Sequence, residues 1–113
     1  MESILDSIKK LLGISAEYTQ FDYDIIMHIN TVFLNLNQLG VGPAEGFFIE
    51  DNIAEWSEFV GEDLNMNAVK TYVYLKVKLL FDPPLSSAVI QSTNNMISEL
   101  EWRLNAAAES DTE

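Results

Sequence analysis

The only histidine of the chain, His28, follows Asp24 by four residues, a spacing that places both side chains on one face of a helix. Such a pair can orient an imidazole for proton transfer or supply two ligands to a metal ion. A metal site usually needs three or four protein ligands, and the chain has no cysteine and no second histidine. No serine stands at a motif spacing that would make it a nucleophile. We therefore expect no catalytic residue and no metal ligand, and a structural or surface role for His28.

A run of carboxylates between residues 50 and 63 is the second group that could do chemistry. Paired acids perform general acid–base catalysis or bind divalent cations. The run lacks the alternating oxygen ligands and the obligatory glycine of an EF-hand loop, so solvated helix faces are the commoner explanation. The acids are Glu50, Asp51, Glu55, Glu58, Glu62 and Asp63.

Residues 40–46 contain three glycines and a proline. No Gly-Lys-Ser/Thr follows and no parallel-sheet unit frames them, so they do not form a phosphate-binding loop, and no cofactor is expected. The composition predicts a flexible loop instead. If the loop has a function, contact with another protein is favoured, with Phe47 and Phe48 as apolar anchors.

The balance of charge argues against one broad class of partner. With 18 acidic and 6 basic residues, the 113-residue chain carries a formal charge of −12. Binding to a phosphate backbone is driven by cations that displace condensed counterions, so tight nucleic-acid binding is not expected. Two cases stay open: a protein that stands next to DNA without adhering to it, and one that mimics DNA to block a DNA-binding partner.

Length and composition predict one folded domain. Hydrophobic residues make up 48% of the chain, which is enough to bury a core. The absence of cysteine excludes disulfides and thiolate nucleophiles. No apolar run is long enough for a signal peptide or a membrane span, so we expect a soluble protein without a membrane partner.

Two amphipathic helices are predicted in the first third of the chain. Residues 3–12 carry apolar side chains at helical spacing behind a capping box of Ser3 and Asp6. Thr19 and Asp22 repeat the capping-box spacing before a longer stripe, which predicts the central core helix. That stripe consists of Ile25, Ile26, Ile29, Val32, Phe33, Leu36 and Leu39.

The middle of the chain has less regular patterns. Residues 47–49 form either a very short strand or a plug that enters the core from a loop. Asn52 with Glu55 can cap a short helix around Trp56. Residues 67–81 alternate partly as a strand would, but apolar residues also recur at helical spacing, and no hairpin turn supplies a pairing partner. We favour a helix for this segment.

Asp82, Pro83 and Pro84 must end that helix, because proline disfavours helical geometry in the residue before it and lacks an N–H donor. A sharp corner follows, and Ser86 or Ser87 can cap a last helix.

Together these elements predict an all-α fold: a small bundle of about four to five helices with a Gly/Pro-rich loop and a helix–Asp-Pro-Pro–helix corner. We assign residues 1–105 to one domain and residues 106–113 to an acidic, frayed C-terminal tail.

The remaining basic and aromatic side chains are candidates for protein contact. Three of the six basic residues lie in residues 67–81, as a solvated edge or as a surface that pairs with acidic groups of an identical neighbour in a ring. Trp56 and Trp102 are expected in the core or an interface, because no basic groove accompanies them to hold stacked bases. The candidate interface residues are Phe47, Phe48, Lys70, Lys76, Lys78, Pro83, Pro84, Trp102 and Arg103.

The C-terminal half of the chain resembles a known family. Residues 72–84, a short serine-bearing link and residues 94–104 are similar to small head–tail connector proteins of tailed phages and prophages, also described as adaptor or head-completion proteins. Residues 22–43 resemble the long second helix of that family and the loop after it. The resemblance covers roughly residues 20–105, and its motifs are structural rather than catalytic.

This resemblance implies a non-enzymatic virion protein that assembles as a ring, dodecameric when complete, on the portal protein of the filled capsid. Such a ring extends the DNA channel and presents a platform for the stopper or tail-completion protein, while DNA passes through without tight binding. By the same analogy, the chain from Ser86 onward docks on the portal, and residues 40–50 contact a neighbouring subunit or the next ring. The protein is then expected at the head–tail interface of the virion, and in the host cytoplasm during assembly.

The alternative function is an acidic DNA mimic that inhibits a DNA-binding protein. A mimic arranges carboxylates in phosphate-like rows on one face, whereas an adaptor spreads charge around a lumen and leaves apolar patches at its sides. An enzyme is the third possibility, and it requires a pocket that gathers His28 with several carboxylates.

Overall fold

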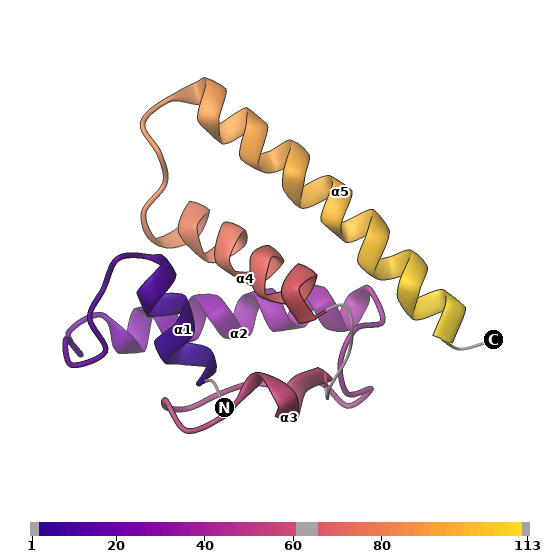
Figure 1. Cartoon of the computed structure of the whole chain (residues 1–113), viewed down its shortest axis with the longest axis horizontal. Helices are drawn as coiled ribbons and strands as arrows, with labels where there is room; N and C mark the ends of the chain where they lie inside the picture. The colour runs from indigo at the N-terminus through magenta and orange to yellow at the C-terminus, as the bar shows by residue number, and fades with distance from the viewer. Residues whose placement is uncertain (1–2, 61–65, 112–113) are drawn as a thin grey trace.

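The computed structural model describes residues 3–60 and 66–111, and over these residues the regular structure is helical, with no strand (Figure 1). The helices are α1 (Ile4–Leu11), α2 (Asp22–Gln38), α3 (Trp56–Val60), α4 (Met66–Phe81) and α5 (Ser87–Asp111). Helices α1 and α4 pack against α2, and α5 lies beside α4 and runs in the opposite direction (Figure 1). The predicted all-α bundle is confirmed.

The start of α1 agrees with the prediction, whereas the start of α2 does not. Ser3 Oγ accepts a hydrogen bond from the backbone N–H of Asp6 at 3.2 Å and so caps α1. The predicted capping box of Thr19 and Asp22 is wrong, because α2 begins at Asp22 without a side-chain cap. The Asp22 carboxylate instead pairs with Lys9 of α1, whose Nζ lies 2.8 Å from Oδ1. The tertiary ion pair replaces the local cap.

The segment with mixed strand and helix signals is helix α4. Its buried side chains recur at helical spacing and face the core. The helix ends at Phe81, before the two prolines, and Ser86 Oγ accepts a hydrogen bond from the backbone N–H of Val89 at 3.4 Å at the start of α5. The predicted helix, corner and cap are therefore confirmed. The buried residues of α4 are Val69, Tyr72, Val73 and Val77.

The segment between α2 and α3 plugs the core from a loop. Ile49 is buried. Its backbone N–H donates a hydrogen bond to Asn30 Oδ1 at 2.8 Å, and its backbone carbonyl accepts one from Asn30 Nδ2 at 3.0 Å. This amide takes the place of a strand partner and satisfies the backbone at a buried point. Helix α3 begins at Trp56, later than predicted, and the Glu58 carboxylate accepts a hydrogen bond from the N–H of Glu55 at 2.7 Å just before it.

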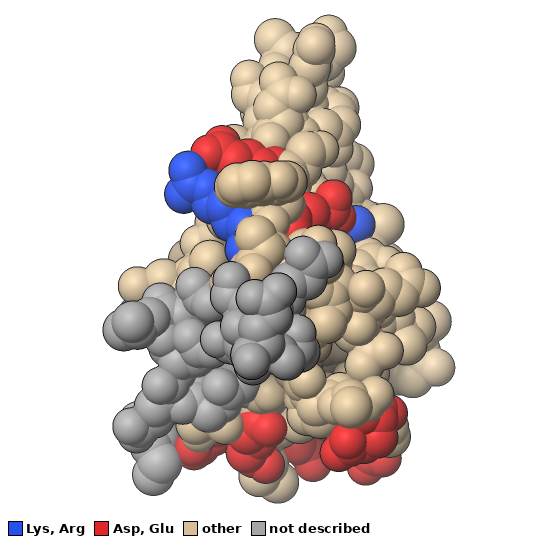
Figure 2. All heavy atoms as spheres, turned by 90° about the vertical axis from the view of Figure 1, so that its right-hand side faces the viewer, with Lys and Arg blue, Asp and Glu red and all other residues tan. Residues whose placement is uncertain are grey.

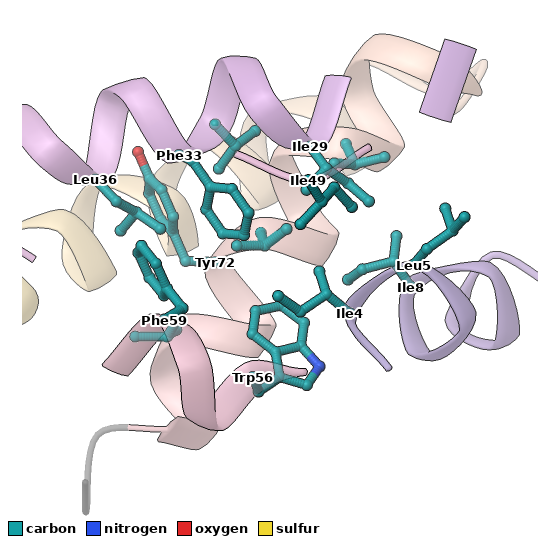
Figure 3. Packing of buried hydrophobic residues seen from close by; sticks show 14 of the residues in the cluster. Ile4, Leu5, Ile8, Ile29, Phe33, Leu36, Ile49, Trp56, Phe59 and Tyr72 are labelled. Atoms are coloured by element: carbon teal, nitrogen blue, oxygen red, sulfur yellow. The ribbon is translucent and has the colours of Figure 1, made fainter. Parts of the chain in front are cut away.

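Aromatic rings from three segments meet in the core (Figure 3). Phe33 of α2 stacks on Phe59 of α3 with centroids 4.6 Å apart, and Phe47 and Trp56 pack edge-on against Phe33. Gly42 has a φ of +89° and passes so close that a β-carbon there would lie 2.4 Å from a Phe59 ring atom. The loop after α2 therefore requires glycine at this point. The buried apolar residues are Ile4, Leu5, Ile8, Ile25, Ile29, Val32, Phe33, Leu36, Ile49, Trp56, Phe59, Val69, Tyr72, Val73, Val77, Ile97 and Leu104.

Helix α5 is attached to the rest of the bundle through its C-terminal half. The Tyr72 hydroxyl of α4 donates a hydrogen bond to Glu101 at 2.7 Å, and the Asn105 side chain donates one to the carbonyl of Leu39 at 3.1 Å. Leu104 is buried between these two contacts. The second half of α5 is thus tied both to α4 and to the end of α2.

The same contacts explain why α5 runs past its predicted end. It continues to Asp111, through most of the segment 106–113 assigned to a frayed tail. Residues 106–108 are half-buried, and Ala108 Cβ would lie 3.3 Å from a β-carbon added at Gly40. Alanine has the highest helix propensity, so residues 106–108 favour a helix, and their packing on the loop after α2 stabilises it further. The division at residue 105 stays a prediction.

Candidate protein-interaction surfaces

The residues considered for chemistry do not form a metal site in the described part of the chain. His28 is half-buried, and its ring lies beside Phe81 with centroids 6.5 Å apart. Within residues 3–60 and 66–111, no three His, Asp or Glu side chains come together in a way that could hold a metal ion. Two of the acids in the carboxylate run, Glu62 and Asp63, lie outside the described residues. Among the described helices, none combines the length and the apolar character needed to cross a bilayer.

The two loop phenylalanines occupy different environments. Phe47 is half-buried and packs on Phe33 and Phe59, with centroids 5.4 Å and 5.3 Å away, so it belongs to the core. Phe48 is 70% exposed and borders an open hollow beside α3. Of the two predicted anchors, only Phe48 is placed where a partner can reach it. The hollow is lined by Phe48, Ile49, Glu50, Asp51, Ile53, Ala54 and Glu58.

The candidate lysines of α4 lie beside groups of their own chain. Lys78 Nζ lies 2.9 Å from Asp82, and Lys76 Nζ lies 4.0 Å from Glu101. Lys70 Nζ lies over the ring of a buried tryptophan, 6.0 Å from its centroid. Exposed ion pairs contribute little to stability, so these contacts leave the lysines able to exchange partners. Acids of a neighbouring copy would have to compete with them.

The two tryptophans separate into a core and a surface residue. Trp56 is buried, and its indole N–H donates a hydrogen bond to Ser7 Oγ at 2.8 Å. Trp102 is 72% exposed on α5, next to the ion pair of Arg103 with Glu99 at 2.6 Å. Trp102 is therefore a surface aromatic of the kind that anchors protein interfaces.

The corner at Pro83 and Pro84 opens an exposed and uncharged segment, which we call the α5 arm, residues 83–98. It contains no Asp, Glu, Lys or Arg in a chain of net charge −12. In Figure 2 the narrow upper end, where α5 starts, carries no charged residue, whereas acidic side chains gather at the opposite end. The exposed large apolar residues of the arm are Leu85, Val89 and Met96.

A second exposed apolar surface was missed by the sequence analysis. Tyr23, Met27 and Leu34 of α2 are 74%, 53% and 65% exposed, and Thr31 between them is exposed as well. The four residues follow helical spacing on the side of α2 away from the core, and we call them the α2 outer face. The signal was present, because α2 is apolar on more than one face, which is typical of a helix covered on both sides.

The comparisons with known proteins give one match. A family model described as "Phage connector protein" matches residues 4–111, which includes all five of the described helices. No curated protein and no solved structure matches the chain.

Proposed function

Since this chain belongs to the phage connector protein family and so has a head–tail connector role, we propose that it forms a ring on the portal protein. In this position the ring extends the DNA channel and carries the stopper or tail-completion protein. The family match over residues 4–111 is the observation that carries the proposal. The protein is a component of the head–tail interface of the virion, and it meets its partners in the host cytoplasm during assembly.

The charge of the chain suits a channel through which DNA moves. A net charge of −12 gives a ring of copies a strongly negative potential, and a surface without a cationic patch releases no counterions on contact with DNA. Most of the described cations are already beside carboxylates of the same chain: Lys9, Lys76, Lys78 and Arg103. DNA therefore passes without tight binding.

The proposed role requires no reaction. Membership of a structural connector family supports a non-enzymatic protein, and its work is done by surfaces that hold other proteins. The exposed side chain of Phe48 and the hollow beside it form one such surface, in the segment 40–50 that the family analogy assigns to a neighbouring subunit or the next ring. The acidic rim of the hollow favours a partner segment that combines apolar and basic residues.

The DNA-mimic alternative gains less support. Asp22, Asp82 and Glu99 each pair with a cation of their own chain, which removes them from any phosphate-like row. The two uncharged surfaces on α2 and α5 have no role in a mimic, whereas an adaptor needs apolar sides to meet its neighbours.

A genetic experiment tests the proposed function. A phage or prophage whose copy of this gene is deleted should package DNA into capsids that carry a portal but no tail, and the gene supplied in trans should restore tailed particles. Normal tailed particles from the deletion would contradict the connector role. Empty capsids with a portal but no tail would agree with the proposal as well, because the stopper would have no ring to bind and packaged DNA could leave through the portal.

A further inference from the structure

Most side chains of the α5 arm are left uncovered by the described part of the chain. Between Pro83 and Ser98 only Ile97 is buried, and Leu85 is fully exposed. Isolated helices of this length are marginal in water and are normally stabilised when one face packs against another element. The first turns of α5 therefore present a preformed helical surface that a second molecule can cover.

The α2 outer face has the matching character. Tyr23, Met27 and Leu34 expose large apolar side chains to water. A partner that covered them would remove this apolar area from water, which favours binding. Residues 25–44 contain no Asp, Glu, Lys or Arg. This stretch and residues 83–98 are the two longest uncharged stretches of the chain.

The charge of the chain decides which surfaces of two copies can meet. Each copy carries a net charge of −12, so most pairs of surfaces bring carboxylates together, and the repulsion between like charges opposes such contacts. Contact between the α5 arm and the α2 outer face brings together two surfaces whose own residues carry no charge. The acids of α2, Asp22 and Asp24, lie in its first turn beside Tyr23, at one end of this face. Self-association is least opposed at this pair of surfaces.

The two surfaces also match in length and shape. From Tyr23 to Leu34 a helix rises about 16 Å, and from Ser87 to Met96 it rises about 14 Å. The small side chains of Ala88 and Ser92 on the arm leave room for large side chains opposite, as ridges-into-grooves packing requires. Because the two surfaces are different, each copy can bind one neighbour through its arm and another through its α2 outer face. Such head-to-tail contacts can close into a ring.

From these observations we propose that the α5 arm of one copy packs against the α2 outer face of the next copy. This inference rests on the proposed ring and names the surfaces that build it. It differs from the family analogy, which assigns the chain from Ser86 onward to the portal. Lys76 and Lys78 already have carboxylates of their own chain beside them, so this apolar contact, rather than ion pairing, supplies the main attraction between neighbours.

Cysteine cross-linking tests the proposal, because the chain has no cysteine of its own. Val89→Cys and Leu34→Cys variants are purified separately, mixed in the presence of the portal and treated with a short bis-maleimide. A covalent heterodimer of the two variants is expected. Ile53→Cys, which is 75% exposed on a different surface, is the matched control and should give no heterodimer with Val89→Cys.

Other products would overturn the inference. Linkage of Val89→Cys to itself means that two arms pair, and linkage to the portal alone means that the arm docks there. A charge test adds an independent readout: Val89→Glu should abolish ring formation, and Val89→Glu with Leu34→Lys in one chain should restore it. Rings that form on the portal without the heterodimer refute this contact but keep the proposed function. Absence of both rings and portal binding refutes the proposed function as well.

Discussion

The ammonium group of Lys9 is buried and lies 2.8 Å from the Asp22 carboxylate, so that α1 is tied to the first turn of α2. The same group donates hydrogen bonds to the carbonyls of Ala16 at 3.1 Å and Tyr18 at 2.8 Å. A buried charge is tolerated only when it is paired and hydrogen-bonded, and Lys9 meets both conditions. One cation therefore fixes the whole connection between the first two helices.

Lys9→Met should destabilise the protein by about 3 kcal/mol, because it leaves the partly buried Asp22 carboxylate and two carbonyls without their donor. Urea unfolding followed by circular dichroism measures the change. Lys10→Met is the control: Lys10 is exposed, and its replacement should change the free energy of unfolding by less than about 0.5 kcal/mol. Equal effects of the two substitutions would show that the buried pair contributes nothing specific.

Gly42→Ala should lower the free energy of unfolding by about 2–3 kcal/mol, because the new β-carbon meets Phe59 and the backbone has a positive φ. Gly46→Ala is the matched control, since Gly46 has a similar φ of +94° but no atom within 4 Å of the added carbon. It should cost only about 1 kcal/mol from backbone strain. Thermal unfolding of both variants separates the two contributions, and identical melting temperatures would contradict the close approach.

The elements that the sequence predicted correctly are those with local signals. Ser3 and Ser86 cap helices through groups only three residues away, and the two prolines end α4 by their own covalent geometry. The wrong or missed features depend on distant residues. Lys9 is buried because loop carbonyls and a second helix surround it, and no residue spacing in the sequence predicts this burial. The continuation of α5 past residue 105 has both a local and a distant cause: three alanines favour the helix, and the loop after α2 packs against it.

Tyr72 predicts a dependence of stability on alkaline pH. Burial, then the hydrogen bond to Glu101 and the charge of that carboxylate, raise the pKa of the Tyr72 hydroxyl above its ordinary value. In the unfolded chain the hydroxyl ionises near pH 10. The stabilisation from the protonated folded form is therefore complete below about pH 9 and is lost as the pH rises beyond 10.

Tyr72→Phe checks this dependence. At pH 7 it should cost about 1 kcal/mol, since a hydrogen bond between the two helices is lost. The difference in unfolding free energy between the parent protein and the variant should shrink between about pH 9 and pH 11, because tyrosine in the unfolded chain ionises near pH 10. Parallel pH profiles of the two proteins would mean that the Tyr72 hydroxyl ionises at its ordinary pKa in the folded state.

Replacing both Pro83 and Pro84 by alanine should change the angle at which α5 leaves α4 and impair assembly more than it destabilises the monomer. Pro83 is exposed and Pro84 is half-buried, so the folded monomer has little to lose. Alanines would allow the end of α4 to continue and displace the α5 arm. Sedimentation of the variant with the portal measures assembly, and thermal unfolding of the monomer measures stability. Normal portal binding by the variant would show that the corner only ends a helix.

The sequence indicated which kinds of residue could form an interface, but not which of them are exposed. Phe48 and Trp102 are exposed aromatic residues, but Phe47 belongs to the core although it is adjacent in the sequence. Phe47 and Phe48 differ because the two hydrogen bonds from Asn30 hold the backbone of Ile49 against the core. This position of Ile49 orients the two phenylalanines before it. The α2 outer face lies on the same helix as the predicted core stripe but on the opposite side, and the stripe predicted only a core helix.

Electron microscopy of the protein mixed with purified portal shows whether the protein forms a ring there. We expect a ring of additional density on the outer end of the portal, coaxial with its channel, and particles that retain this density after dilution. Portal particles without added density at saturating protein, together with tight binding of the protein to a nuclease or repressor, would contradict the proposed ring.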